Sequence, residues 1–170
     1  MAEQDHFGRL GLPRRFETDL AALEANYLSR SRLAHPDYHQ NGSEADKADS
    51  LRDSSLLNDA YRTLKDPFKR AEYLLSLLGG PAASEVKEMP QAFLKETLEL
   101  RMRLEELKDE NDEAGLRKMQ SELSKRQTVI LGQVAVEFQS ADSPEALKSI
   151  RQKLNALKFI QGLLRDLRDI

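Results

Sequence analysis

The chain has 170 residues, and its 26 basic and 29 acidic side chains leave a formal net charge of −3. This near balance argues against nucleic acid as the main partner, because phosphate binding needs a concentrated basic surface. The absence of Cys excludes disulfides, thiol nucleophiles and Cys-based metal sites. No apolar run approaches the roughly 20 residues that span a bilayer, and the first residues lack the features of a signal peptide. We therefore expect a cytoplasmic protein.

Apolar residues recur at helical spacing in almost every long segment, and β-branched residues are sparse, which predicts an all-α fold. In the first half, Ser43 is a predicted helix cap, and Asp66 and Pro67 are predicted to cap and begin the following helix. We expect the helices of this half to span residues 5–11, 18–34, 43–65 and 66–78.

The helix predicted at 18–34 has one apolar face, and its period assigns four side chains to the interior. Arg30 lies at the edge of this face and has to extend its charged end to the surface, whereas Arg32 points to the solvent side. The residues predicted to face inward are Leu20, Leu23, Tyr27 and Ala34.

Residues 79–90 begin with Gly-Gly-Pro and show no periodic apolar pattern, which is typical of a linker. This predicts an N-terminal domain at 1–78 and a C-terminal domain at 91–170. Beyond the linker, Ser143 and Pro144 mark a clear helix start. Three helices joined by short turns predict an antiparallel three-helix bundle, with helices at 91–108, 112–139 and 143–167.

The three histidines, His6, His35 and His39, are the natural candidates for proton transfer or metal binding. His35 and His39 have the spacing that places two ligands on one helical face, but Pro36 disfavours a helix through both. No nucleophile motif, glycine-rich phosphate loop or paired-carboxylate signature accompanies them. We therefore predict no catalytic residue, no metal and no cofactor.

His35, Pro36 and Asp37 form a tripeptide between two predicted antiparallel helices. One interpretation is a rigid recognition loop, in which Pro fixes φ while the imidazole and the carboxylate point outward. The alternative is that Pro36 simply ends a helix, with His35 favourable at the helix C-terminus and Asp37 forming a turn. The tripeptide by itself leaves both interpretations open.

Several linked motifs make the sequence resemble the J-domain family. They are the opening segment Asp-His-Phe-Gly-Arg-Leu-Gly-Leu at 5–12, His-Pro-Asp at 35–37, and Asn-x-Ala-Tyr-x-x-Leu-x-Asp-Pro at 58–67. Arg-Ala-Glu-Tyr-Leu-Leu at 70–75, Ala-Phe-Leu at 92–94 and Leu-Glu-Leu-Arg at 98–101 extend the resemblance to HscB-type co-chaperones of iron–sulfur cluster assembly. The resemblance implies a J-domain of a short helix, a helical hairpin and a fourth helix, followed by the three-helix bundle.

The resemblance further implies that His35, Pro36 and Asp37 contact an HscA or DnaK-like chaperone and promote its ATP hydrolysis. The chain itself is then not an enzyme. The absence of Cys also excludes the N-terminal Cys-based metal site of some eukaryotic relatives, so the resemblance is to the bacterial type. In this family the basic face of the second helix supports docking, a role that falls here to Arg32 and Arg30. Tyr38 stands where a basic residue is common in the family.

The helix predicted at 91–108 has apolar side chains on two opposite faces. Phe93, Leu100, Leu104 and Leu107 form one stripe, which we assign to the bundle core. Leu94, Leu98 and Met102, spaced four residues apart, form a ridge on the other side. The ridge is either covered by another part of the chain or exposed as a surface for a protein partner.

The resemblance to HscB-type proteins implies that this ridge binds an IscU-type iron–sulfur scaffold protein, together with an aromatic side chain of the last helix. Lys95 and Met102 depart from the family's usual residues, and Phe159 could instead be a core residue. Two other functions stay open: a J-protein that delivers a different client, and a helical scaffold or dimerisation module without a chaperone partner. The implied scaffold-binding residues are Leu94, Lys95, Leu98, Glu99, Met102 and Phe159.

Overall fold

The computed structural model describes residues 4–35, 37 and 40–169, and within them the chain forms seven α-helices and no β-strand, which confirms the predicted all-α class. Cα proximity divides the chain into two compact units, Met1–Leu74 and Leu75–Ile170. None of the helices in the described part of the chain has both the length and the apolar character needed to cross a membrane. The helices are α1 (His6–Arg9), α2 (Leu20–Ala34), α3 (Glu44–Lys65), α4 (Pro67–Leu77), α5 (Gln91–Asp109), α6 (Glu113–Gln139) and α7 (Pro144–Arg168).

Three helices begin at the capping residues that the sequence predicts. Before α3, the Ser43 hydroxyl accepts a hydrogen bond from Asp46 N–H at 3.1 Å, and the Asp46 carboxylate accepts one from Ser43 N–H at 2.9 Å. Asp66 and Ser143 accept from backbone N–H groups at the starts of α4 and α7, and each is followed by Pro in the first helical position. Local side-chain hydrogen bonds therefore set these boundaries.

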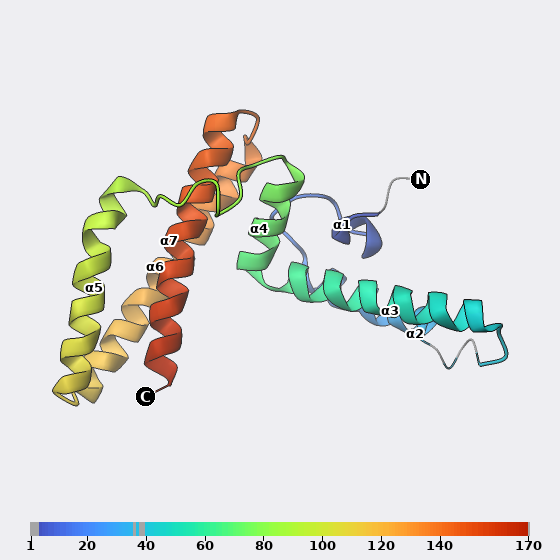
Figure 1. The fold of residues 1–170 in the computed structure, drawn as a ribbon, viewed down its shortest axis with the longest axis horizontal. Coiled ribbons are helices and arrows are strands. Elements are labelled where there is room, and N and C mark those ends of the chain that lie inside the picture. The colour runs from blue at the N-terminus through green and yellow to red at the C-terminus, as the bar shows by residue number, and fades with distance from the viewer. Residues whose placement is uncertain (1–3, 36, 38–39, 170) are drawn as a thin grey trace. The chain divides into compact units, whose positions relative to one another are not determined.

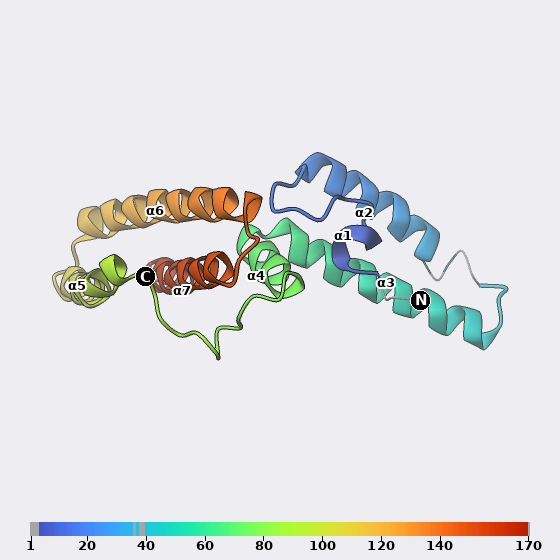
Figure 2. The ribbon, with the colours of Figure 1, turned by 90° about the horizontal axis from the view of Figure 1, so that it is seen from above.

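In the first unit, α2 and α3 lie side by side as an antiparallel hairpin, and α1 packs against α3 (Figures 1 and 2). Residues of the motif at 58–67 connect α3 to α2. The rings of Tyr27 and Tyr61 stack with centroids 4.1 Å apart, and Tyr27 Oη donates to Asn58 Oδ1 at 2.6 Å. The buried apolar side chains of this unit are Phe7, Leu10, Phe16, Leu23, Leu57, Ala60, Leu64, Ala71 and Leu74.

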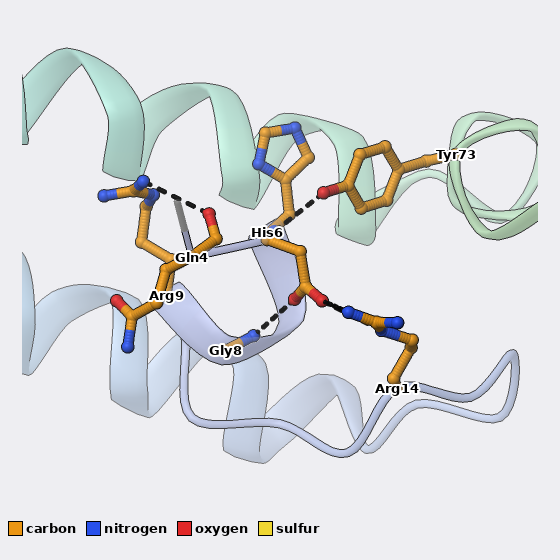
Figure 3. A network of polar contacts seen from close by, with 7 residues as sticks. Gln4, His6, Gly8, Arg9, Arg14 and Tyr73 are labelled. Atoms are coloured by element: carbon orange, nitrogen blue, oxygen red, sulfur yellow. Dashed lines mark hydrogen bonds and ion pairs between the residues drawn. The ribbon is translucent and has the colours of Figure 1, made fainter. Parts of the chain in front are cut away.

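The short helix α1 is held by polar contacts at its start. Asp5 accepts a hydrogen bond from Gly8 N–H at 2.8 Å and forms an ion pair with Arg14. Burial alone would raise the pKa of the Asp5 carboxyl, but the Gly8 hydrogen bond and the Arg14 charge hold that pKa below its ordinary value. His6 N–H donates to Tyr73 Oη at 2.9 Å, and the two rings stack at 4.3 Å, so the start of α1 is fastened to α4 (Figure 3).

The prediction that Leu20 faces inward is wrong. Leu23 is buried as predicted, whereas the Leu20 side chain is 54% exposed. At 100° per residue the two side chains lie about 60° apart around the helix. Leu20 also stands in the first turn of α2, at the margin of the face that packs on α3, so it faces water.

In the second unit, α5, α6 and α7 pack on one another pairwise, as expected for a three-helix bundle. The helix α5 buries Phe93 and Leu104, in agreement with the predicted core stripe. Its remaining attachment comes from partly buried side chains. Most of the bundle core lies on α7, whose buried apolar residues are Ile150, Leu154, Ala156, Leu157, Ile160, Leu163 and Leu167.

The segment 79–90, predicted as a linker, is attached to α7 by one side chain. Asn155 Nδ2 donates to the carbonyl oxygens of Val86 at 2.9 Å and Glu88 at 2.8 Å, and Asn155 Oδ1 accepts from Arg151 Nε at 3.1 Å. The segment thus belongs to the compact unit that starts at Leu75, and the division between the units falls inside α4.

Candidate functional site

The loop after α2 presents two of the three residues of the predicted recognition tripeptide, since Pro36 lies outside the described residues. His35 caps the C-terminus of α2 in an extended backbone conformation, with φ −65° and ψ 135°. Its Nδ1 accepts a hydrogen bond from Asp37 N–H at 3.2 Å, and Asp37 Oδ1 accepts from Gln40 Nε2 at 3.3 Å. Both side chains are exposed, so the loop holds an imidazole and a carboxylate at the end of the hairpin.

The two polar groups of this loop also face each other, because His35 Nδ1 lies 3.4 Å from Asp37 Oδ2. When the imidazole is neutral, Nδ1 accepts from the Asp37 amide and the ring proton is on Nε2. When the imidazole is protonated, Nδ1–H pairs with the carboxylate instead. In either form Nε2–H is a donor available to a partner, and local contacts orient the ring.

The two arginines predicted to support docking have different surroundings. Arg32 is exposed on α2. Arg30 Nη1 donates to the Arg9 carbonyl oxygen and, at 3.4 Å, to the Gly8 carbonyl oxygen. These carbonyls lie in the last turn of α1, and that of Gly8 also accepts from Gly11 N–H at 3.1 Å. The guanidinium of Arg30 therefore fastens α1 to α2, and Arg32 is the arginine of α2 that stays on the solvent side.

The predicted ridge on α5 is exposed, as the helical period indicates. The side chains of Leu94, Leu98 and Met102 are 46%, 66% and 63% exposed. Lys95 and Glu99 are also exposed and stand beside the ridge on the same helix. Within the second unit, α6 and α7 cover the opposite face of α5 and leave this one open. Its exposure is thereby confirmed, while its role stays a prediction.

Phe159 on α7 is half-buried and lies between α7 and α5. Its ring meets Phe93 edge-on, with centroids 5.9 Å apart, and the guanidinium carbon of Arg101 lies 5.8 Å from its centroid. Arg101 Nη1 in turn pairs with Asp166 Oδ2 at 3.1 Å. Phe159 is thus partly a core residue, and the guanidinium of Arg101, which stands next to the ridge on α5, lies over its ring.

In the described part of the chain, no group of three or more His, Asp or Glu side chains is placed to hold a metal ion. His6 stacks on Tyr73, and its pKa is lowered by burial and by the nearby charge of Arg9. His39 lies outside the described residues. His6 is therefore a packing residue of the first unit.

Comparison with known proteins assigns this arrangement to a family. The co-chaperone protein HscB homolog of Aliivibrio salmonicida (strain LFI1238) is 35% identical over 164 residues, which cover 95% of this chain and 94% of the relative. The chain belongs to the HscB co-chaperone family. The family model described as the HSCB C-terminal oligomerisation domain matches residues 89–168, which include α5, α6 and α7.

Solved HscB structures share the fold over nearly the full length. The chaperone HscB from Vibrio cholerae is similar with a TM-score of 0.83 and 32% identity, covering 98% of this chain and 96% of that one. The human co-chaperone protein HscB has a TM-score of 0.86 and 28% identity, covering 99% and 82%. The Jac1 co-chaperone from Saccharomyces cerevisiae, with a TM-score of 0.65 and 23% identity over 100% and 95% of the two chains, shares the fold.

HscB proteins are co-chaperones that act with HscA in iron–sulfur cluster assembly, and the family is non-enzymatic. Family membership confirms the predicted co-chaperone function and the prediction that the chain is not an enzyme. It also argues against the alternative that the chain is a helical scaffold or dimerisation module without a chaperone partner.

Two exposed leucines of this HscB-family chain belong to no surface predicted from the sequence. Leu28 and Leu33 on α2 are 50% and 72% exposed. Helical phase could have found Leu28, which lies about 140° around α2 from the buried Leu23. The exposure of Leu33, in the last turn of α2, is seen only in the structure.

Proposed function

We propose that this HscB-family protein stimulates ATP hydrolysis by an HscA or DnaK-like chaperone and delivers to it an IscU-type iron–sulfur scaffold protein. In this proposal residues 1–78 act as the J-domain, 79–90 as the linker and 91–170 as the client-binding bundle. The chaperone contacts His35, Pro36 and Asp37, and the scaffold contacts the α5 ridge.

The exposed α5 ridge is the observation that carries the proposal. Leu94, Leu98 and Met102 keep about half or more of their side-chain surface in water, although a bundle helix normally turns charged residues outward. Burying a large apolar side chain completely is worth about 1.5–3 kcal/mol, so a protein partner gains free energy by covering this row. Lys95 and Glu99 provide a polar rim of the kind seen around interface cores.

Phe159 extends this surface towards α7. Because its ring is half-buried against Phe93, it offers an aromatic face whose position is already restricted. A rigid aromatic side chain loses little conformational entropy on binding, which favours its use as an interface anchor.

The loop supports the chaperone half of the proposal. His35 and Asp37 are exposed and oriented by their mutual contacts, so Nε2–H of His35 can donate to a partner without a large reorganisation. Arg32 lies in the last turn of α2, close to the loop. Arg30 contributes indirectly, because it holds α1 against α2.

Single-turnover ATP hydrolysis by an HscA-type chaperone tests the chaperone half. We expect the wild type to accelerate hydrolysis and His35→Gln to lose the acceleration, since Gln lacks the imidazole while it keeps the polarity and approximate size of the side chain. Circular dichroism of both proteins is the control for folding. No acceleration by the wild type, or equal acceleration by the variant, contradicts the proposal.

Binding of IscU measured by titration calorimetry tests the client half. Truncating two central interface residues, Leu94→Ala with Leu98→Ala, is expected to cost about 2 kcal/mol or more, an affinity roughly 30-fold weaker. The matched control is Val129→Ala with Val136→Ala, because these two side chains on α6 are 58% and 64% exposed but lie outside the ridge. Unchanged affinity in the leucine variant contradicts the ridge as the binding site. If the chaperone is stimulated but IscU does not bind, the client is a different protein.

A further inference from the structure

The exposed residues in the second half of α6 are all uncharged. Residues 127–140 contain one charged side chain, Glu137, in a chain of which 32% of the residues are charged. Glu137 is engaged within the bundle, because its Oε1 accepts hydrogen bonds from Ser149 Oγ at 3.0 Å and from Lys153 Nζ. A surface helix normally turns charged side chains away from its buried face. The exposed residues, which we call the α6 outer face, are Thr128, Val129, Gly132, Gln133, Val136 and Gln139.

Two valines and a glycine form the middle of the α6 outer face. The side chains of Val129 and Val136 are 58% and 64% exposed. At 100° per residue, Val129, Gly132 and Val136 lie within about 60° of one another around the helix, on the side away from the buried Val134. The row is thus apolar and open to solvent. An open depression in the surface beside it is lined by Val129, Gly132, Gln133, Val136, Glu137 and Lys153.

Nothing within the chain requires glycine at position 132. The residue lies in the interior of a 27-residue helix, and a Cβ added to it would meet no atom within 4 Å. Glycine in a helix interior costs about 1 kcal/mol relative to alanine. What it offers here is space on the outer side of the bundle, because a residue without a Cβ lets another backbone come close.

A second copy of the chain complements the α6 outer face. Two α6 helices can pair antiparallel about a two-fold axis that passes between residues 132 and 133, and such a symmetric pairing uses the same surface on both copies. The two Gly132 residues then come together near the axis, where the backbones approach most closely. Val129 of each copy lies level with Val136 of the other, so the apolar side chains cover one another.

The charges at the two ends of this face favour the antiparallel arrangement. In a parallel pair each residue would meet its own copy, so Lys125 would meet Lys125 and Glu137 would meet Glu137. Like charges brought together at an interface cost affinity. In the antiparallel pair every charged residue is level with a neutral one instead. These pairs are Lys125 with Ser140, Arg126 with Gln139 and Glu137 with Thr128.

We propose that two copies of the chain associate through the α6 outer face, antiparallel about a two-fold axis, with Val129 of each copy packed on Val136 of the other and the Gly132 residues at the crossing. The family model that matches the bundle is described as an oligomerisation domain, and the proposal adds the face, the symmetry and the register. One helix face offers less than the roughly 800 Å² per partner of a standard interface, so the dimer is weak, with a dissociation constant on the order of 100 µM.

Sedimentation velocity of the intact chain at about 5–500 µM tests the face and the register. We expect the wild type to shift from monomer to dimer over this range. Val129→Lys with Val136→Lys sets like charges against each other and should weaken the dimer at least about tenfold. Val129→Lys with Val136→Glu sets opposite charges against each other in the antiparallel register alone, and should dimerise at least about fivefold more tightly than the double lysine variant.

The matched control is Leu98→Lys with Met102→Lys on α5, because these side chains are 66% and 63% exposed but lie outside the α6 outer face. We expect this control to dimerise like the wild type. Gly132→Ala gives a second readout that misfolding cannot produce. Alanine is the better helix former, so the melting temperature of the dilute chain should rise, whereas its added Cβ should weaken the dimer at least about threefold.

The absence of Cys allows a direct test of the register by oxidation of single-cysteine variants. In the proposed dimer the two Cys of Gln133→Cys are offset by about 1.5 Å along the helix axis, and at a helix separation of about 8 Å their Cα atoms come within disulfide range. The two Cys of Ser124→Cys are about 25 Å apart along the axis. We expect a disulfide-linked dimer from the first variant and none from the second.

The outcomes separate this inference from the proposed function, on which it does not rest. A wild type that stays monomeric over the whole range, or a double lysine variant that dimerises as tightly as the wild type, overturns the inference. So does a dimer in which the Lys and Glu combination gains nothing over the double lysine variant, because the register is then wrong. A monomeric wild type whose IscU binding is lost in the double lysine variant would assign the face to the client. Stimulation of the chaperone through His35 is unaffected by any of these results.

Discussion

Arg30 and Arg32 stand two residues apart on α2, and the structure gives them opposite roles that a pair of substitutions can separate. In Arg30→Met, the side chain keeps an apolar stem but can no longer donate to the carbonyl oxygens of Arg9 and Gly8. The C-terminal end of α1 then loses these contacts with α2 and keeps the hydrogen bond from Asn26 Nδ2 to the Leu10 carbonyl oxygen at 2.8 Å. In Arg32→Met, an exposed cation on the solvent side of α2 is removed.

The magnitude follows from these contacts. A hydrogen bond to a charged group contributes about 1.5–3 kcal/mol when buried, but the guanidinium of Arg30 is partly exposed and one of its contacts is long at 3.4 Å. We therefore expect a loss of about 1–2 kcal/mol of unfolding free energy. For a unit of this size that lowers the melting temperature by about 5–10 °C. Arg32→Met is expected to stay within about 0.5 kcal/mol of the wild type.

Tyrosine fluorescence can follow this unit within the intact chain. The chain has no Trp, and its four tyrosines all precede Leu75, so their emission reports the first unit while circular dichroism reports both. Equal melting temperatures for the two variants would refute the role of Arg30 in fastening α1 to α2. So would an Arg30→Met protein that melts like the wild type but fails to stimulate the chaperone, because that result would make Arg30 a direct docking residue.

Three further predictions concern other parts of the fold. Asn155→Leu removes the donor to two carbonyls of the 79–90 segment. We expect the unfolding free energy of the second unit to fall by about 1–3 kcal/mol and tryptic cleavage at Lys87 to become faster. Unchanged cleavage would show that Asn155 does not hold the segment. Burial lowers the pKa of His6, so the unfolded chain binds a proton at this imidazole more readily than the folded chain does. The melting temperature of the first unit should therefore fall as the pH drops below about 6.5. His6→Gln should make the melting temperature less dependent on pH. An identical slope in His6→Gln would assign the titration to another group. Arg101→Met releases Phe159 from a cation–π contact worth about 0.5–1 kcal/mol and should weaken IscU binding by roughly two- to fivefold in calorimetry, whereas equal affinity would show that Arg101 does not position the ring.

Helix boundaries and helix faces were predictable because they depend on short-range interactions. Capping at Ser43, Asp66 and Ser143 involves residues at most a few positions apart, so the sequence contains both partners of each hydrogen bond. The helical period likewise placed the α5 ridge opposite the core stripe, whereas its exposure is a result of the structure. Once Phe93 and Leu104 face the bundle, Leu94, Leu98 and Met102 must face away from it.

The family motifs were also visible in the sequence, but the contacts behind them were not. The pairing of Tyr27 with Asn58 and Tyr61 joins residues about 30 positions apart, and the stacking of His6 on Tyr73 joins residues 67 apart. Such pairs form because two helices pack, and the pattern within either helix does not specify its partner.

By itself, the sequence determined the all-α class, the extents of the helices, the tripeptide at 35–37 and the presence of a second apolar row on α5, because each depends on local capping or on the phase of a single helix. Only the tertiary structure decided where the marginal side chains go. Leu20 faces water, Arg30 turns to the end of α1, and Asn155 holds the 79–90 segment. A side chain at the edge of a helical face can turn either way at little cost, and the neighbouring backbone or side chain that it meets, brought there by packing, determines which way it turns.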